Sequence, residues 1–279
     1  MRNRYLILGI YLMAALLFSS SVFAQTIYYS PSSGGGRTKE ALAAAAADPR
    51  PATYDKHDLS GIWYGGKNPR VFSPTPPPFT PEGKKRFDAN KPSFGPRAVI
   101  PALGNDPIGR CDPLGFPRNL WVAGRSFEII QSPSKYIQTF EWTRAFREIW
   151  TGKQRIPEEP DPRWYGWAVG HWDGDTFVVD SKGYDDKTWV DDLGYPHSEN
   201  MVLQERWNRV NYDTLELVMT LTDPEIYTKP WVSAKQTYKL QLPKELTIMG
   251  EDFCVPSENE FFNENVRNLA GTGNKNPKK

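Results

Sequence analysis

The chain has 279 residues, of which 39% are hydrophobic and 13% aromatic, enough apolar material for one large folded domain or two small ones. Its formal net charge is +1, so no overall positive field favours nucleic acid or an anionic membrane surface as a partner. The three histidines and two cysteines match no zinc-binding spacing. Motifs for phosphate loops, dinucleotide binding and serine hydrolases are also missing from the sequence, which predicts no metal and no cofactor.

Residues 1–24 are predicted to be a secretory signal peptide. Arg2 and Arg4 form a basic start, residues 5–17 form an apolar run, and cleavage is expected after Ala24. The apolar run is shorter than the ~20 residues that span a bilayer, and an uncleaved anchor helix is the alternative. We therefore expect a periplasmic or extracellular protein without a membrane span after signal cleavage.

Residues 25–57 are predicted to be a flexible segment, because they are rich in serine, glycine and alanine. The alanine tract over 40–48 could form a short helix. A single domain is expected to cover residues 58–279. Its Pro-rich insertion over 66–120, with a short helix over 80–89, is expected to lie across the domain as a lid.

After residue 120, short runs of alternating apolar and polar residues are separated by turn residues, the pattern of β-strands. Strands are predicted over residues 58–63, 127–131, 135–150, 164–172, 175–180, 201–210, 214–222, 231–242 and 245–255. Many strands with short links must close their edges or stack as two sheets. We predict an all-β, antiparallel up-and-down barrel with few short helices, and a sandwich is the alternative.

Cys111 and Cys254 are the two cysteines of the chain. An oxidising compartment would allow them to form a disulfide, which would hold the insertion to the end of the domain. Two buried free thiols are the alternative.

Gly61-Ile62-Trp63, on the first predicted strand, resembles the G-x-W signature of the lipocalins and their calycin relatives. In that family the tryptophan closes one end of the barrel and an arginine from the far end of the chain packs over it. The resemblance implies a lipocalin-like barrel. Arg267 is the only arginine after Arg209 and lies beyond the last predicted strand, so this chain departs from the family pattern there.

Longer segments resemble a family of secreted bacterial proteins without a described function. The resemblance spans about residues 58–265 and rests on TPEGKKRFDANKP, ALGNDPIGRCDPLGFPR, DPRWYGWAVGHWDGDTFVVD and DPEIYTKPW. It implies a shared fold and a shared site, but it names no reaction.

Residues 164–180 predict a hairpin that turns at Asp173-Gly174, with His171 opposite Thr176. One face of this hairpin combines aromatic rings with a few polar groups, as ligand pockets do: Tyr165, Trp167, Val169, His171, Thr176, Val178 and Asp180. We expect this face to point into the barrel, where His171 could transfer protons near neutral pH. The alternative is a histidine bonded near the turn at the rim.

Residues 183–198 contain four aspartates, a histidine and a serine. Asp192 could orient His197 across the intervening turn, as a carboxylate orients imidazole in catalytic triads. A solvated loop whose aspartates cap turns is the alternative, and a Ca²⁺ loop lacks the EF-hand pattern.

On the strand over 201–210, Glu205, Trp207 and Arg209 share one face. Glu205 could act as a base and Arg209 could bind a substrate carboxylate, whereas a ladder of salt bridges on the outer surface is the alternative. Arg118 would reach the same pocket if the insertion is a lid.

The leading hypothesis is an exported barrel protein that binds a small apolar or aromatic molecule in its cavity. The predicted ligand-binding residues are Tyr165, Trp167, Asp180, Trp207, Arg209 and Arg118. The second hypothesis is a cofactor-free enzyme, a lyase, isomerase or hydrolase, whose active site is the same cavity. Its predicted acid–base residues are His171, His197, Asp192 and Glu205. The third is a structural or interaction protein of the cell envelope.

Overall fold

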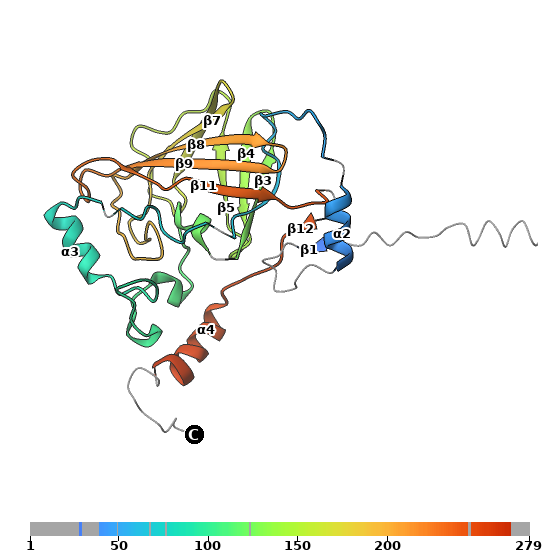
Figure 1. Cartoon of the computed structure of the whole chain (residues 1–279). Coiled ribbons are helices and arrows are strands. Elements are labelled where there is room, and N and C mark those ends of the chain that lie inside the picture. Colours follow the sequence, from blue (N-terminus) through green and yellow to red (C-terminus); the bar gives the residue numbers. More distant parts are fainter. Residues whose placement is uncertain are drawn as a thin grey trace, which may run out of the picture.

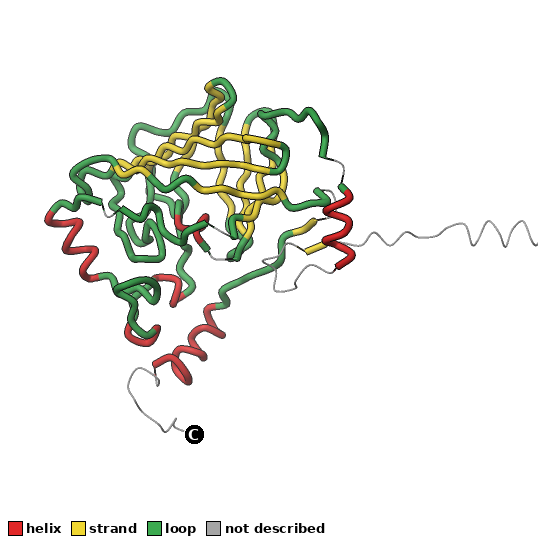
Figure 2. The backbone as a smooth tube through the Cα atoms, in the orientation of Figure 1, coloured by secondary structure: helices red, strands yellow, loops and turns green. Residues whose placement is uncertain are grey.

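The computed structural model describes residues 28–29, 39–48, 50–66, 68–75, 77–122, 124–244 and 247–268. The predicted signal peptide over residues 1–24 lies outside these described residues. The described chain is mostly β, with most of its strands gathered in one block, two short strands apart from it, and most of its helices outside it (Figure 2). Among the described helices, none has the length and apolar character needed to cross a membrane.

Nine strands of the described chain close into a barrel (Figure 1). The ring closes at β9 (Thr214–Thr222), which pairs with β8 (Val202–Asn211) on one side and with β11 (Gln236–Leu240) on the other. From β11 the ring continues through six strands in chain order: β2 (Gly61–Tyr64), β3 (Ser126–Gln131), β4 (Lys135–Phe140), β5 (Phe146–Trp150), β6 (Trp167–Asp173) and β7 (Thr176–Lys182). A mostly β fold closed as a barrel is therefore confirmed.

Short elements lie outside the ring. The strands are β1 (Tyr28–Tyr29), which pairs in parallel with β12 (Thr247–Ile248), and β10 (Trp231–Val232), which pairs with β9. The helices are α2 (Lys39–Ala47), α3 (Pro81–Ala89), α4 (Pro256–Phe262), the 3-10 helices η1 (Pro101–Leu103), η2 (Pro107–Arg110) and η3 (Arg118–Trp121), and the π-helix η4 (Asn263–Arg267). α2 forms on the alanine tract. α3 begins as predicted, with the Thr80 hydroxyl accepting a hydrogen bond of 3.0 Å from the amide of Gly83.

One pair of neighbouring strands corrects the predicted topology. β5 and β6 run parallel, with Ile149 beside Ala168 and Trp150 beside Val169, so the barrel is mixed rather than wholly antiparallel. The segment over 135–150, for which a long bent strand or a hairpin was predicted, is the hairpin of β4 and β5. The connection over 151–166 then returns the chain to the end of the barrel at which β5 began.

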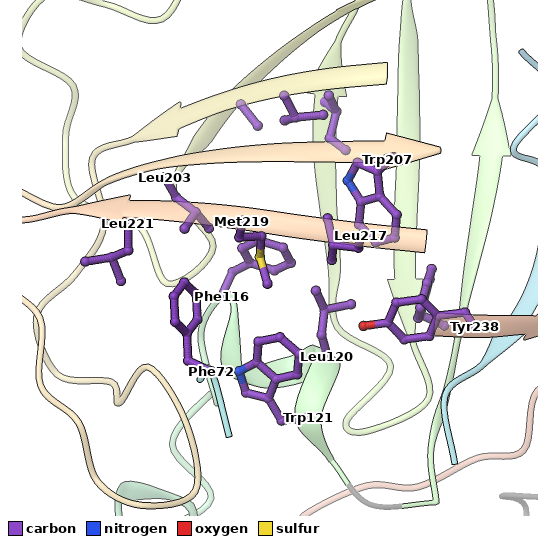
Figure 3. Packing of buried hydrophobic residues seen from close by; sticks show 14 of the residues in the cluster. Phe72, Phe116, Leu120, Trp121, Leu203, Trp207, Leu217, Met219, Leu221 and Tyr238 are labelled. Carbon is purple, nitrogen blue, oxygen red and sulfur yellow. The ribbon is translucent and has the colours of Figure 1, made fainter. Parts of the chain in front are cut away.

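Side chains of the insertion fill the barrel from one end. Figure 3 shows Phe72 and Phe116 of the insertion, with Trp121 directly after it, facing Leu203 and Met219 of the wall, all of them 2% exposed or less. Each large apolar side chain buried in this way contributes roughly 1.5–3 kcal/mol. The insertion therefore contributes side chains to the core, whereas the prediction had it only lying across the domain as a lid.

The disulfide between Cys111 and Cys254 is present, with the two Cα atoms 5.4 Å apart. It joins the residue that follows η2 to the extended segment before α4. The pairing confirms that the insertion is covalently held to the C-terminal part of the described chain.

Candidate functional site

The hairpin of β6 and β7 turns at Gly174-Asp175, one residue later than predicted. Gly174 has φ +58°, a left-handed conformation that suits the first central position of a two-residue hairpin turn. His171 therefore lies opposite Val178 instead of Thr176. Within the two strands, from Trp167 to Lys182, the residues expected to share each face do share it. Tyr165 precedes β6 and does not share the face of His171.

The direction of these faces is the reverse of the prediction. Gly170 points inward, where a Cβ atom would collide with Cζ of Phe177, so glycine provides the space that the ring occupies. His171 lies on the outer face and is exposed to water. Asp180 lies on the same outer face, half-buried, and accepts a hydrogen bond of 2.9 Å from Gln204. Neither residue lines the interior.

Glu205 and Trp207 do point into the barrel, but Glu205 is not a free base. Its carboxylate accepts hydrogen bonds of 2.7 and 3.2 Å from the guanidinium of Arg147 and one of 3.0 Å from Nε1 of Trp207. The side chains of Arg147 and Glu205 are 1% and 0% exposed. The ion pair is internal, so the alternative of a ladder on the outer surface is also wrong.

Arg209 lies near the opposite end of the barrel from Trp167, close to the tip of the β6–β7 hairpin. Its guanidinium carbon is 5.7 Å from the centre of the Trp63 ring. The guanidinium donates to the carbonyl oxygens of Asp58 and Tyr212. Arg209 thus closes the barrel over Trp63 and does not reach a ligand pocket.

His197 is 1% exposed and fully hydrogen-bonded. Its Nδ1 lies 3.1 Å from the carbonyl oxygen of Ser198, and its Nε2 lies 2.7 Å from the hydroxyl of Thr188. Because a carbonyl only accepts, we assign the hydrogen to Nδ1, and Nε2 accepts from Thr188. Burial lowers the pKa of His197, which favours this neutral form. Through these two hydrogen bonds, His197 links Thr188 to Ser198 within the loop over 184–198.

Asp192 pairs with arginines, and it does not orient His197 as predicted. Arg118 donates through Nε to Asp192 at 3.1 Å, while its two terminal nitrogens bind Asp106 at 2.8 and 2.6 Å. Arg70 also binds Asp192, at 2.7 Å. The structure therefore places Arg118 in a buried network that holds the insertion on the loop over 184–198.

The pocket that can receive a small molecule lies where β5 and β6 diverge. These strands pair only from Ile149 and Ala168 onward, so the first three residues of β5 have a strand neighbour on the β4 side alone. The opening between them is a pocket of about 230 Å³. Its lining residues are Phe146, Arg147, Glu148, Trp150, Arg163, Trp164, Tyr165, Gly166, Trp167 and Ala168. We call it the seam pocket.

Aromatic side chains dominate the seam pocket. The rings of Trp150 and Trp167 meet edge to face, with centres 5.5 Å apart. The guanidinium carbon of Arg163 lies 3.3 Å over the Trp167 ring. Trp164, also half-buried, adds a third indole to the lining.

Tyr165 anchors the inner side of the seam pocket. Its ring stacks on Phe140 of the core at 6.0 Å, and its hydroxyl accepts a hydrogen bond of 3.0 Å from Nδ2 of Asn119. Burial raises the pKa of Tyr165, so the hydroxyl keeps its proton. Tyr165 and Trp167 are the two predicted ligand-binding residues that the structure brings together.

Gly166 explains how neighbouring aromatic residues reach one pocket. It adopts φ +63°, and a Cβ atom there would lie 2.7 Å from the ring of Tyr184. Its amide donates to the carbonyl of Arg163 at 3.2 Å, which closes a tight turn. The turn directs Tyr165 toward the core while Trp167 begins β6.

A larger depression of about 550 Å³ has no aromatic ring in its lining, which consists of Ile62, Glu128, Arg144, Thr247, Ile248, Met249 and Glu251. Among the described residues, no cluster of three or more histidine, cysteine, aspartate or glutamate side chains could hold a metal ion. Of these two openings, the seam pocket is the one whose lining combines several aromatic rings with polar groups, as small-molecule sites do.

The sequence interpretation missed Arg147, Trp150, Arg163 and Trp164. A signal for Arg147 was available, because it alternates with Ile149 on β5 and so shares its inward face. The others could be grouped only with knowledge that β5 and β6 are neighbours. Comparison of the chain with protein-family models, curated proteins and solved structures finds no match in any of the three.

Proposed function

We propose that the chain is an exported barrel protein that binds a small aromatic molecule in the seam pocket. One observation carries the proposal: three indoles and a phenol surround a single opening of about 230 Å³. Ligand pockets of drug-sized molecules measure roughly 300–1,000 Å³, so this one suits a molecule of one or two rings.

The pocket offers both packing and direction to such a ligand. Trp150 and Trp167, already edge to face, provide ring faces and edges for stacking. Tyr165 supplies a protonated hydroxyl on the core side of the pocket. The small side chain of Ala168 leaves space for the ligand in the same lining. A planar ring with a polar substituent satisfies both features.

The experiment is a calorimetric titration of the purified protein with a panel of one- and two-ring aromatic compounds, beside a thermal-shift measurement. A binder must raise the apparent stability, because it binds only the folded state. Trp167→Leu should weaken binding by about 10-fold or more, since it removes a ring face from the site. Phe261→Leu, which changes an exposed ring on α4, is the matched control and should leave binding unchanged.

Absence of heat and of stabilisation across the panel would refute this function. If a compound bound the unaltered protein and the Trp167→Leu variant with equal affinity, its binding site would lie outside the seam pocket.

The two other hypotheses, an acid–base enzyme and a structural protein of the cell envelope, stay predictions. His57, His171 and His197 are not among the residues that line the seam pocket. Its carboxylate, Glu148, is paired with Lys135, which lowers the pKa of Glu148 and weakens it as a base. No geometry in the described chain favours catalysis over binding.

Two further features support the rest of the proposal. The disulfide between Cys111 and Cys254 suits an oxidising compartment, in line with the basic and apolar N-terminal sequence. The chain-order succession of strands and the arginine over Trp63 support a lipocalin-like architecture, with Arg209 of β8 supplying the arginine.

A further inference from the structure

Arg163 is held at the rim of the seam pocket by its backbone. Its amide donates to the carbonyl of Gly183 at 3.0 Å, and its own carbonyl accepts from the amide of Asp185 at 3.0 Å. The residue is exposed, yet the guanidinium lies on the Trp167 ring. Both the chain and the side chain of Arg163 are therefore fixed beside the opening.

The stacking leaves the hydrogen-bonding edge of Arg163 available. A guanidinium is planar, and its five N–H groups lie in that plane, while contact with an indole uses the face. Among the described residues, no carboxylate lies within 4.0 Å of Arg163 (its side chain forms none of the ion pairs found in those ranges). The edge can therefore bind an acidic group.

The other charges of the seam pocket are already balanced. Arg147 in the floor is neutralised by Glu205, and Glu148 in the wall is paired with Lys135. Arg163 acts on Glu148 only at longer range, adding to the lowering of its pKa. The charge in the lining that lacks a close partner is thus the positive charge of Arg163.

We propose that the ligand of the seam pocket is an aromatic acid whose carboxylate binds Arg163 while its ring packs among Trp150, Trp164 and Trp167. This inference rests on the proposed function and narrows it to one chemical class. A guanidinium fork matches the two oxygens of a carboxylate, which gives both orientation and a preference for the anion. An uncharged ring of the same shape keeps the stacking and loses the ion pair.

The test compares 2-naphthoate with 2-naphthamide, which share a ring system and differ in charge, by calorimetric titration at pH 7. The naphthoate should bind about 5-fold or more tightly, a modest factor because Arg163 is exposed and screened. Arg163→Gln should abolish this preference, so that the two compounds bind the variant with equal affinity. Arg155→Gln is the matched control, since Arg155 is an exposed arginine of the same connection outside the lining.

The outcomes separate the two proposals. Equal binding of both compounds, or a preference that survives Arg163→Gln, would overturn the acid class while the aromatic pocket stands. Failure of both compounds to bind would overturn this inference, and absence of binding across the whole aromatic panel would overturn the pocket function with it.

Discussion

Arg147 and Glu205 form an ion pair from which water is almost wholly excluded. Removing two charges from water is costly, and the pair repays that cost only through close, complementary hydrogen bonds. Here Glu205 accepts from both terminal nitrogens of Arg147 and from Trp207, and the Arg147 guanidinium lies 3.7 Å over the Phe116 ring. Breaking one side of such a pair is far more damaging than replacing both.

Glu205→Gln should therefore lower the free energy of unfolding by about 3–5 kcal/mol, because Arg147 keeps its buried charge without a counter-charge. Replacing both residues, as Arg147→Met with Glu205→Leu, should lose less than the single change. The measurement is urea unfolding followed by tryptophan fluorescence. Asp88→Asn, in the exposed pair with Lys84, is the control and should cost no more than about 0.5 kcal/mol. Similar losses for Glu205→Gln and Asp88→Asn would contradict the internal ion pair.

Asp191 is a buried carboxyl group whose environment favours the protonated form. Burial raises its pKa to about 6, although the amides of Phe72 and Leu193 each donate to it at 2.9 Å and act in the opposite direction. The pKa in the folded protein is above the ordinary value of 3.8, so the folded state binds this proton more tightly than the unfolded state. The stability contributed by Asp191 is complete below about pH 4 and is lost as the pH rises to about 6.

Asp191→Asn removes this titration. Between pH 4 and pH 7 the unfolding free energy of the unaltered protein should fall by roughly 2–2.5 kcal/mol relative to that of the variant, from a pKa difference of about two units. Urea unfolding at pH 4, 5, 6 and 7 measures the difference directly, and all other titrating groups are common to both proteins. A difference that stays constant with pH would show that Asp191 is ionised like an exposed aspartate.

At the scale of the element, the β6–β7 hairpin shows what the sequence could and could not predict. The alternation grouped the residues of the two strands on the correct faces, because strand side chains alternate strictly, although the turn lies one residue later than predicted. It failed for Tyr165, because the left-handed Gly166 breaks the alternation before β6. Which face points inward depends on fit against Phe177 and the other strands, and the alternation does not contain that information. The aromatic residues beside His171 favoured the wrong face, whereas Gly170 and Ala168 mark the packed one.

Two neighbouring substitutions test this orientation. Gly170→Ala should lower stability by about 1–3 kcal/mol, because the added methyl group meets the Phe177 ring and lies 3.0 Å from Cγ2 of Ile149. His171→Gln, on the exposed face, should change stability by no more than about 0.5 kcal/mol. Urea unfolding of both variants decides the matter. A larger loss of stability for His171→Gln than for Gly170→Ala would show that His171 faces the interior and Gly170 faces water.

At the scale of the whole molecule, closure of the barrel creates the site. The parallel contact of β5 with β6 is short, so the wall opens beside it and the seam pocket forms. A parallel neighbour was not predictable, since crossovers between parallel strands are usually helical and the connection over 151–166 has no helical pattern. Arg147 and Glu205 meet across 58 residues of sequence, and a charged residue in an alternating strand is ordinarily assigned to water.

More general features followed from the sequence alone. Turn residues and alternation predicted an all-β chain that must close its edges, and the cysteine count allowed the disulfide that is present. Of the site, the sequence supplied Tyr165 and Trp167 but placed them inside the barrel. They line its wall opening because the interior at that level is occupied by Arg147, Glu205 and the aromatic core.

The most direct test of the aromatic pocket is a two-dimensional ¹H–¹⁵N spectrum of the tryptophan indoles during addition of 2-naphthoate. The indole signals of Trp150, Trp164 and Trp167 should shift together, while those of Trp63 and Trp207, buried within the barrel, should stay in place. Shifts confined to Trp63 and Trp207, or no shift in any indole signal, would contradict binding at the seam pocket.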